Sequence, residues 1–318
     1  MINKPTVFVH TNDQQIVGAL VAAFSMKRGS KSADAFDVKL IRLEQTPHLL
    51  KRQGQTYLRK GKQAVWHNED LQSFSPLRMM VPQLMNYHGR AVVTDPDIFA
   101  AGDIYELLTM DMGGKAIMCR NINSGYKGNG NSFYASSVML LDCGKLAHWR
   151  WDHDIGDMFA GRLDYGPWIG LTNEDPATIG ELGEEWNSFD KLVTETKLLH
   201  LTERSTQPWK TGLPVDFDLN TKTSSPAGIG SLLRSLLGRG KGSSSTSSHY
   251  LPHPDRKQEK FFFDLLKEAI EKGEIDEDFI QKRVQAMDVR SDIFDLLYSR
   301  SYKPSRRPGK LVSAYGVQ

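Results

Sequence analysis

Apolar runs and helical periodicities alternate along the first part of the chain. The run TVFVH at 6–10 is typical of a buried strand, and an apolar helical stretch follows at 15–26. The segment FDVKLIRLE at 36–44 alternates apolar and polar positions like a second strand. A strand, a helix and a strand in this order predict a parallel pair joined by a right-handed crossover.

The same alternation continues to residue 202 and predicts an α/β domain built on one sheet. Ser75 and Pro76 stand where the N-cap and the first position of a helix are expected, and Asp103 is expected to cap a later helix. The further expected strands are 90–95, 115–120, 136–143 and 196–202, and the further expected helices are 75–85, 103–110 and 151–159.

The composition of the chain changes after residue 219. A Ser/Gly-rich stretch follows, and one island within it, IGSLLRSLLGRG, pairs leucines with arginines at helical spacing. Two interpretations of this island stay open: a partly ordered linker, or a segment that contacts an anionic membrane surface. The predicted organisation is a main domain at 1–219, a linker at 220–255, a helical hairpin at 256–300 and a disordered basic tail at 301–318.

The helical hairpin is predicted from apolar stripes and two helix boundaries. Gly273 is expected to end the first helix, and Asp276 to cap the second. The stripe of the first helix comprises Phe261, Phe262, Leu265, Leu266 and Ile270, and the second helix carries Phe279, Val284 and Met287.

Composition and charge narrow the classes of partner. Lys and Arg number 40 against 38 Asp and Glu, so the net charge of +2 gives no reason to expect nucleic acid as a partner. No apolar stretch approaches the roughly 20 residues of a membrane span, and residues 1–15 lack a signal-peptide core. Cys119 and Cys143 lie beside apolar runs and are expected to be core residues. We expect a soluble, cytoplasmic protein, at most peripheral to the inner face of the membrane.

The tripeptide Asp95-Pro96-Asp97 directly follows the strand expected before it. Taken alone it fits a turn, because Asp and Pro both favour turns. Ligands of open α/β sheets bind at the carboxyl ends of the strands, however. Two carboxylates there, about 6–7 Å apart along an extended backbone, fit a shared hard cation. Without a cation they would repel each other.

The residues around this tripeptide resemble glycosyltransferases of the GT-A type, in particular family 8 and its bacterial relatives. The similar features are an Arg-containing helix that ends in Pro, a strand that ends in Asp-x-Asp, and a following Gly-Asp-Ile. The resemblance continues in ASSVMLLDC, LGEEWN and KLLHLTERSTQPWKTG, which stand in the family's order, and it covers residues 6–215. It implies the GT-A fold, a Rossmann-like mixed sheet flanked by helices. The helical hairpin predicted from its apolar stripes would be a C-terminal extension of this fold.

The resemblance also implies a metal site made of Asp95, Asp97 and His200. In the family, such a group holds Mn²⁺ or Mg²⁺ against the diphosphate of a nucleotide-sugar donor. Oxygen ligands together with one imidazole suit Mn²⁺ better than Mg²⁺. The metal would act as a Lewis acid on the leaving UDP.

Donor-binding residues are implied at two further places. Arg78 matches the family's helix arginine and is a candidate for positive charge beside the phosphates or the sugar. Thr11, Asn12 and Asp13 leave the first strand, where such enzymes hold the nucleoside. Asn12 or Asp13 would serve equally well as a helix cap.

The end of the resemblance departs from the family's pattern. The family closes with Gly-x-x-Lys-Pro-Trp, and this chain has Ser205 and Gln207 in place of the Gly and the Lys. Lys210 or Arg204 would then have to supply the phosphate-binding charge. A solvated lysine after a buried Trp explains Lys210 equally well.

The sequence therefore predicts a metal-dependent glycosyltransferase that moves a hexose from a UDP-sugar to a saccharide or lipid-linked acceptor, with retention. Glu174 or Asp175 best matches the polar residue beneath the sugar in the family, and the alternative is a cap for the turn before Pro176. A second hypothesis is a catalytically idle relative that binds nucleotide-sugar or glycan and uses its hairpin for a protein partner. The replacement of the family's Gly and Lys by Ser205 and Gln207 is the feature that favours this second hypothesis.

Overall fold

A six-stranded mixed sheet forms the centre of the molecule. Its strands are β1 (Thr6–Thr11), β2 (Asp37–Arg42), β5 (Arg90–Thr94), β7 (Ile117–Asn123), β8 (Ser132–Asp142) and β9 (Ile179–Glu181). They stand in the order β2-β1-β5-β8-β7-β9. β1 is parallel to β2 and β5, whereas β8 is antiparallel to β5 and β7, which confirms the expected mixed α/β class. The computed structural model describes residues 4–70, 73–123, 132–217 and 248–298.

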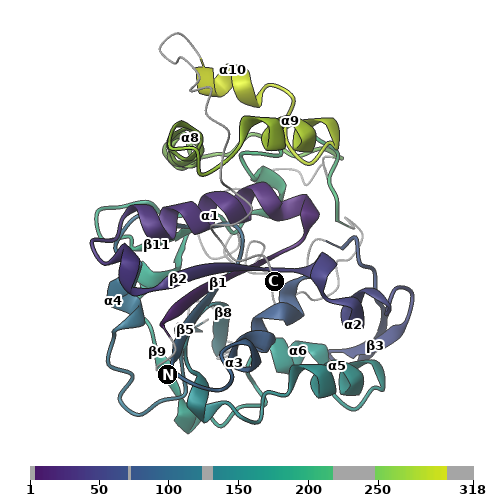
Figure 1. Ribbon diagram of the computed structural model, residues 1–318. Coiled ribbons are helices and arrows are strands. Elements are labelled where there is room, and N and C mark those ends of the chain that lie inside the picture. The colour runs from purple at the N-terminus through teal and green to yellow at the C-terminus, as the bar shows by residue number, and fades with distance from the viewer. Residues whose placement is uncertain (1–3, 71–72, 124–131, 218–247, 299–318) are drawn as a thin grey trace.

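Helices cover both faces of this sheet (Figure 1). Val7 and Val9 belong to the core on one face, and Phe8 belongs to the core on the other. Successive side chains of a strand alternate between faces, so a strand covered on both sides is apolar throughout. This explains the continuous apolar run of the first strand. The covering helices include α1 (Ile16–Arg28) on the first face, and α5 (Trp151–Phe159) and α6 (Tyr165–Ile169) on the second.

Both cysteines are buried in the second core, which confirms the expectation that they are core residues. Burial raises the pKa of the Cys119 thiol to about 12. Burial likewise raises the pKa of Cys143 to about 12. Neither side chain is therefore a thiolate at neutral pH, and neither is a candidate nucleophile.

A second, three-stranded sheet shows that the expectation of one sheet was wrong. It consists of β10 (Ser188–Phe189), β11 (Leu198–His200) and β6 (Ile98–Ala100), in that order. The strand expected at 196–202 exists as β11, but it pairs outside the main sheet. The chain leaves the main sheet at Pro96, which has no N–H to donate to a neighbouring strand. β6 then begins at Ile98 and runs antiparallel to β11.

Residues 75–85 were expected to form one helix, but this segment contains two short helices of different type. A 3₁₀ helix occupies Ser75–Met80, and a short α-helix, α3, follows at Val81–Leu84. Pro82 cannot donate to the carbonyl four residues earlier, so one continuous α-helix would lose a hydrogen bond in its middle. Phe74, and not Ser75, stands at the N-cap, and it makes no side-chain capping hydrogen bond. Asp103, by contrast, caps α4 (Ile104–Leu108) as predicted.

The pattern of apolar positions missed one β-hairpin, formed by β3 (Thr56–Arg59) and β4 (Lys62–Val65). Its strands are largely exposed and polar, so they lack the alternation that marks a half-buried strand. Lys60 and Gly61 turn the chain with positive φ angles of 51° and 73°. The carboxylate of Asp164 accepts hydrogen bonds from both of their N–H groups, at 2.7 and 2.6 Å, and so holds the turn.

Three helices follow in the C-terminal part of the described chain, where two were expected. α8 (Arg256–Glu271), α9 (Glu277–Gln285) and α10 (Ile293–Tyr298) lie over α1, on its side away from the sheet (Figure 1). They share one apolar core with α1 and the sheet. Asp276 caps α9 and Gly273 has the φ of 70° that ends α8, both as predicted. The linker before residue 248, with its Leu/Arg island, and the basic tail lie outside the described residues.

No helix in the described ranges is long and apolar enough to cross a membrane.

Gly18 allows α1 to lie directly against the Asp-x-Asp turn. A Cβ atom at this position would come within 2.7 Å of Trp209 Cζ2 and 2.9 Å of the carbonyl oxygen of Pro96. The Pro96 contact is with backbone and the Trp209 ring is fully buried, so neither neighbour can move freely. A glycine inside the helix therefore fixes the separation between α1 and the turn.

We expect Gly18→Ala to destabilise the protein by about 1–2 kcal/mol. Ala favours helix over Gly by about 1 kcal/mol, but overpacking a tight core costs about 1–3 kcal/mol. Gly156→Ala in α5 is the matched control, because a Cβ there meets nothing within 4 Å. Urea unfolding of both variants checks this. A Gly18→Ala protein as stable as Gly156→Ala would show that the contact with the turn is not tight.

Candidate active site

The Asp-x-Asp turn lies where the two sheets meet. The N–H of Asp95, just after β5, donates to the carbonyl of Ser137 in β8 at 3.2 Å. The carbonyl of Asp97 accepts from the N–H of Leu201, just after β11, at 3.1 Å. His200 is the last residue of β11, which pairs with β6 immediately after the turn. The backbone therefore brings two aspartates and a histidine from distant parts of the sequence to one place.

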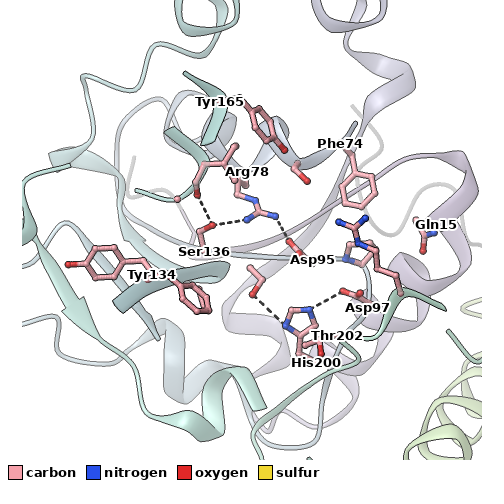
Figure 2. Close-up of a pocket in the computed structure, with 18 of the residues that line it drawn as sticks. Gln15, Phe74, Arg78, Asp95, Asp97, Tyr134, Ser136, Tyr165, His200 and Thr202 are labelled. Atoms are coloured by element: carbon pink, nitrogen blue, oxygen red, sulfur yellow. Dashed lines mark hydrogen bonds and ion pairs between the residues drawn. The ribbon is translucent and has the colours of Figure 1, made fainter. Parts of the chain in front are cut away.

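Asp95, Asp97 and His200 converge, as the sequence analysis expected. Each residue offers one potential ligand atom, and these atoms lie within 4.8 Å of one another. His200 Nε2 lies 3.6 Å from Asp97 Oδ1 (Figure 2). Within the described ranges, this is the one group of three His, Cys, Asp or Glu residues arranged to hold a metal ion.

Asn187 determines which nitrogen of His200 carries the proton. The amide Nδ2 of Asn187 donates to Ser137 Oγ at 2.9 Å and faces the carbonyl of Ala135 at 3.4 Å. Its Oδ1 therefore faces His200 Nδ1, at 2.9 Å. Because Oδ1 can only accept, Nδ1 must carry the hydrogen. The neutral Nε2 then presents a lone pair toward Asp97, and His200 supplies no proton to this contact.

The ionisation of these groups suits a cation. Burial, and next the adjacent Asp95, raise the pKa of Asp97 well above its ordinary value. Among the described residues, Asp97 Oδ1 has no hydrogen-bond donor. Burial lowers the pKa of His200 to about 4, so its imidazole is neutral at pH 7 and free to act as a ligand. A buried carboxylate oxygen that faces an imidazole lone pair fits Mn²⁺ or Mg²⁺.

Asp95 is held by two basic side chains. Its Oδ1 accepts a hydrogen bond from Arg78 Nη2 at 2.8 Å and lies 3.0 Å from His10 Nε2. Arg78 also donates through Nη1 to Ser136 Oγ, whose hydroxyl donates to the carbonyl of Ile169 (Figure 2). Burial alone would raise the pKa of Asp95, but Arg78 and then His10 lower this pKa to about 2. The carboxylate of Asp95 is therefore ionised and fixed in position at neutral pH, and it can serve as an oxygen ligand to a metal ion.

A cavity opens in front of the Asp-x-Asp turn. Two arginines, Arg78 and Arg204, and the two aspartates give it charges of both signs. Aromatic side chains form part of its wall (Figure 2). A few charged groups within a partly aromatic wall are typical of sites for small ligands. The other lining side chains include Gln15, Phe74, Phe133, Tyr134, Ser136, Tyr165, Thr202 and Gln207.

The residues predicted to hold the nucleoside lie beside this cavity rather than in its lining. Asn12 Oδ1 accepts from the N–H of Gln15 at 3.1 Å and caps the 3₁₀ helix Asp13–Gln15, which is the alternative that the sequence left open. The hydroxyl of Thr11 donates to the carbonyl of Asn12. Asp13 lines a second groove. The other residues of this groove are Gln14, Leu43, Glu44, Leu50, Asn68, Glu69 and Asp288.

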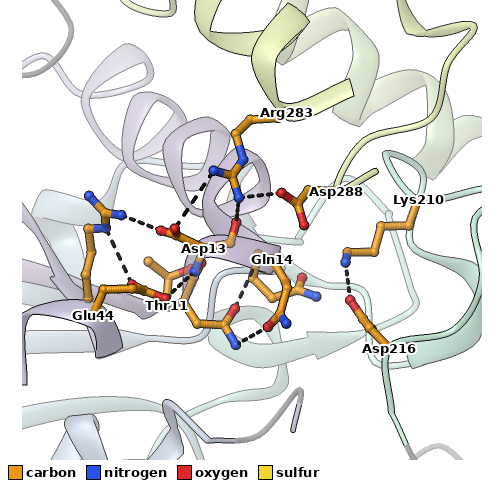
Figure 3. A network of polar contacts seen from close by, with 11 residues as sticks. Thr11, Asp13, Gln14, Glu44, Lys210, Asp216, Arg283 and Asp288 are labelled. Carbon is orange, nitrogen blue, oxygen red and sulfur yellow. Dashed lines mark hydrogen bonds and ion pairs between the residues drawn. The ribbon is translucent and has the colours of Figure 1, made fainter. Parts of the chain in front are cut away.

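Lys210 is buried and does not line the cavity. Its Nζ donates to one carboxylate oxygen of Asp216 (Figure 3). The hydroxyl of Tyr250 donates to the other. This pairing offsets the cost of burying an ammonium group. Arg204, which the sequence analysis named as the alternative, does line the cavity. Its positive charge favours the ionised form of Asp97.

Glu174 and Asp175 are also absent from the cavity lining. One carboxylate oxygen of Glu174 contacts His148 Nε2 and the other accepts from Trp149 Nε1, each at 2.8 Å. Asp175 accepts from the N–H of Ala177 at 2.9 Å and caps the 3₁₀ turn that follows. This cap is the alternative that the sequence left open. A catalytic role for either carboxylate stays a prediction.

Sequence reasoning missed two residues that organise the site, His10 and Asn187. His10 is the last-but-one residue of β1, and a polar side chain ending an apolar strand is a weak signal on its own. Both side chains are fully buried. Asn187 belongs to the LGEEWN block that carries part of the resemblance, so the signal for it was present in the sequence. Its role became clear only when folding placed it beside His200.

No protein-family model matches the chain, and no curated protein matches it in sequence. Solved structures that resemble it are glycosyltransferases, the class that the sequence motifs indicate. One is the glycosyltransferase GlyE of Streptococcus pneumoniae TIGR4, with 16% identity and a TM-score of 0.44 over 65% of this chain and 57% of that chain. Another is the galactosyltransferase LgtC, with 12% identity and a TM-score of 0.44 over 75% and 98% of the two chains. Mouse xyloside xylosyltransferase 1 has 14% identity and a TM-score of 0.40 over 61% and 96%.

The matched region spans 57% of the GlyE structure and 48% of the bifunctional glycosyltransferase WbbM, so it is only about half the length of these proteins. At these identities and TM-scores, the resemblance carries no argument about the reaction.

We expect Asp97→Asn to raise the melting temperature of the metal-free protein at pH 7–8. The folded-state pKa of Asp97 lies above its unfolded value, so ionisation of this side chain opposes folding once the pH exceeds the unfolded pKa. An amide removes that penalty. The stabilising effect should vanish at a pH below the unfolded pKa, about 3.9, where both states are protonated.

Mn²⁺ should raise the melting temperature of the wild type but not of Asp97→Asn, because only the wild type keeps the complete ligand set. Asp264→Asn is the control, since Asp264 is an exposed carboxylate on α8. Thermal scans with and without Mn²⁺ check both expectations. A destabilised Asp97→Asn protein, or equal effects of Mn²⁺ on all three proteins, would contradict the cation site.

We expect Asn187→Ala to weaken Mn²⁺ binding about 10–100-fold, the usual cost of losing a residue that orients a metal ligand. Without the Asn187 acceptor, His200 is free to rotate or to change its tautomer. Titration of Mn²⁺ into apo protein measures the effect, and the exposed Asn173→Ala serves as the control. Unchanged affinity in Asn187→Ala would mean that His200 is oriented by something else or does not ligate.

Proposed function

We propose that the chain is a divalent-metal-dependent glycosyltransferase that moves a hexose from a UDP-sugar to a saccharide or lipid-linked acceptor, with retention. The observation that carries the proposal is the convergence of Asp95, Asp97 and His200, in which an unpartnered carboxylate oxygen faces an unprotonated imidazole nitrogen. The order of the sequence blocks around these residues, which resembles family 8 glycosyltransferases, supports UDP-sugar as the donor.

The three residues would hold Mn²⁺ or Mg²⁺, which neutralises the donor diphosphate and acts as a Lewis acid on the departing UDP. The arginines of the cavity add positive charge from the protein. Arg204 is better placed for the phosphates than Lys210, because Arg204 lines the cavity and Lys210 does not. Arg78 would keep Asp95 ionised and fixed in position through its 2.8 Å hydrogen bond.

The nucleoside would lie along the loop between β1 and α1, where the second groove begins. Leu43 and Leu50 give this groove an apolar surface for a base, and the carboxylates of Asp13 and Glu44 would accept hydrogen bonds from ribose hydroxyls. Thr11 and Asn12 keep the loop in shape through their own hydrogen bonds. Of the three residues predicted to serve the nucleoside, only Asp13 would contact it directly. Thr11 and Asn12 would support it indirectly, by holding the loop.

The sugar and the acceptor would occupy the main cavity, where Phe74, Tyr134 and Tyr165 offer aromatic surface. The identity of the hexose and of the acceptor depends on these lining residues. A cytoplasmic location and peripheral membrane contact stay predictions, since the Leu/Arg island lies outside the described residues. Nucleic acid is not proposed as a partner, given the near-neutral net charge.

Binding of a nucleotide-sugar without turnover is a second candidate function. Among the described residues that line the cavity, Asp95 and Asp97 are the only carboxylates, and both are assigned to the metal. Glu174 and Asp175, the expected polar residues beneath the sugar, have partners elsewhere. A catalytically idle relative would keep metal and UDP binding but would neither transfer nor hydrolyse any UDP-hexose.

We expect calorimetry to show UDP binding that requires Mn²⁺, and binding weakened by about 100-fold or more in Asp95→Asn. The expected loss exceeds the roughly 10–100-fold cost of a change next to a ligand, since a ligand itself is removed. A screen of UDP-hexoses for release of UDP, with and without saccharide acceptors, then separates transfer from idle binding. If UDP binds neither protein in the presence of Mn²⁺, the tripeptide is a turn and the proposed function is wrong.

A further inference from the structure

The C-terminal helices contact the walls of the candidate site through two arginines. Arg283 in α9 reaches the loop between β1 and α1, and Arg290, between α9 and α10, reaches the segment that carries Gln207. Apolar packing of α8 on α1 would hold these helices in place without such contacts. Arg283 and Arg290 therefore add polar contacts to this apolar packing, and both contacts lie beside the cavity or the groove.

Arg283 holds the loop that forms one side of both spaces. Its Nη2 donates to the backbone carbonyl of Asp13 at 2.8 Å and to the carboxylate of Asp288, and its Nη1 lies 3.9 Å from Asp13 Oδ2 (Figure 3). The same carbonyl of Asp13 accepts from the N–H of Ile16. Gln15, between these two residues, lines the main cavity. The position of Gln15 and Asp13 therefore depends on a side chain more than 260 residues away in the sequence.

Arg290 contacts a second segment, the one that carries Gln207. Its backbone N–H donates to the carbonyl of Trp209 at 2.8 Å, and its Nη1 donates to the carbonyl of Pro208 at 3.3 Å. Asp292 fixes the guanidinium through two hydrogen bonds, at 2.6 and 2.9 Å. Pro208 directly follows Gln207, which lines the cavity. One short stretch of the C-terminal part thus contacts two segments that each carry a lining residue, Gln15 or Gln207.

We propose that the C-terminal helices are part of the donor site, with Arg283 and Arg290 as positioning residues for its two walls. This inference rests on the proposed function, and it gives these helices a role in binding the nucleotide rather than a protein partner. Asp288 supports it, because this residue lines the groove proposed for the nucleoside and also fixes Arg283. The nucleoside groove is then closed on one side by a residue from outside the α/β domain.

A second ion pair between the same two parts of the protein supplies a matched control. Arg28 of α1 donates to Glu268 of α8 at 2.6 Å, which also ties the C-terminal helices to the main body. Neither residue lines the cavity or the groove. The side chain of Arg28 is 43% exposed and that of Arg283 is 18% exposed, so Arg283 is the more confined of the two. If Arg28 and Arg283 both only hold the C-terminal helices in place, replacing one or the other should have the same small effect on ligand binding.

The test compares Arg283→Ala, Arg283→Lys and Arg28→Ala in the full chain. We expect the Kd for UDP in the presence of Mn²⁺ to rise about 10-fold in Arg283→Ala, because the loop of Asp13 and Gln15 loses the charge-assisted hydrogen bond that holds it. Arg283→Lys keeps the charge and a donor and should recover part of the loss. Arg28→Ala should match the wild type. The Kd for Mn²⁺ alone should stay unchanged in every variant, because the metal ligands are untouched.

Amide hydrogen exchange gives a readout that does not need UDP. The amides of Gln15 and Ile16 should exchange faster in Arg283→Ala than in Arg28→Ala, because their acceptors lie in the loop that Arg283 holds. If Arg283→Ala does not fold, Arg283→Met, which keeps an apolar stem but no charge and no donor, carries the comparison, and wild-type affinity in that variant would overturn the inference.

Two failures can be told apart. Wild-type affinity and wild-type exchange in Arg283→Ala, while the wild type binds UDP, would overturn the inference and leave the proposed function standing. A wild type that binds no UDP would overturn both.

Discussion

Three hydrogen-bond acceptors, Asp95, Asp97 and His200 Nε2, meet at the junction of the two sheets. Asn187 fixes the tautomer of His200, and none of the described residues donates to Asp97 Oδ1. Burial and the adjacent Asp95 make ionised Asp97 unfavourable for the protein alone, and the positive charge of Arg204 offsets only part of that cost. A carboxylate that only shapes the backbone is satisfied by N–H groups, as Asp276 is at the start of α9. A divalent cation would turn this electrostatic cost into binding free energy, which couples stability to ligand binding.

The remaining structure keeps these acceptors together. β5 and β11 end at the turn from two different sheets, and Gly18 lets α1 approach the backbone of Pro96 closely enough to fix it from one side. Arg78 and His10 hold Asp95 from another side. The C-terminal helices add support at a greater distance, through polar contacts to the two walls of the cavity. Functional sites of this kind locally oppose folding and depend on the surrounding core for their geometry.

The sequence could predict the elements whose pattern is set by burial on two faces, such as β1 and α1, and the three potential metal ligands, whose motif order resembles a known family. It could not predict the second sheet, because the pairing of β6 with β11 depends on where the chain turns at Pro96. Lys210 and Glu174 looked available in the sequence, yet each has a partner that only folding brings close, Asp216 and Trp149. His10 and Asn187 were missed for the same reason: the role of a buried polar residue depends on its neighbours in space.

The central claim is that a divalent cation binds between Asp95, Asp97 and His200 and holds the diphosphate of a nucleotide. Anomalous diffraction from a crystal grown with Mn²⁺ and UDP tests it most directly. The account predicts an anomalous peak within coordination distance of His200 Nε2 and of one oxygen from each aspartate, with UDP phosphate oxygens completing the coordination. A crystal that contains UDP but shows no peak at this place, or a Mn²⁺ peak at other residues only, would contradict the claim.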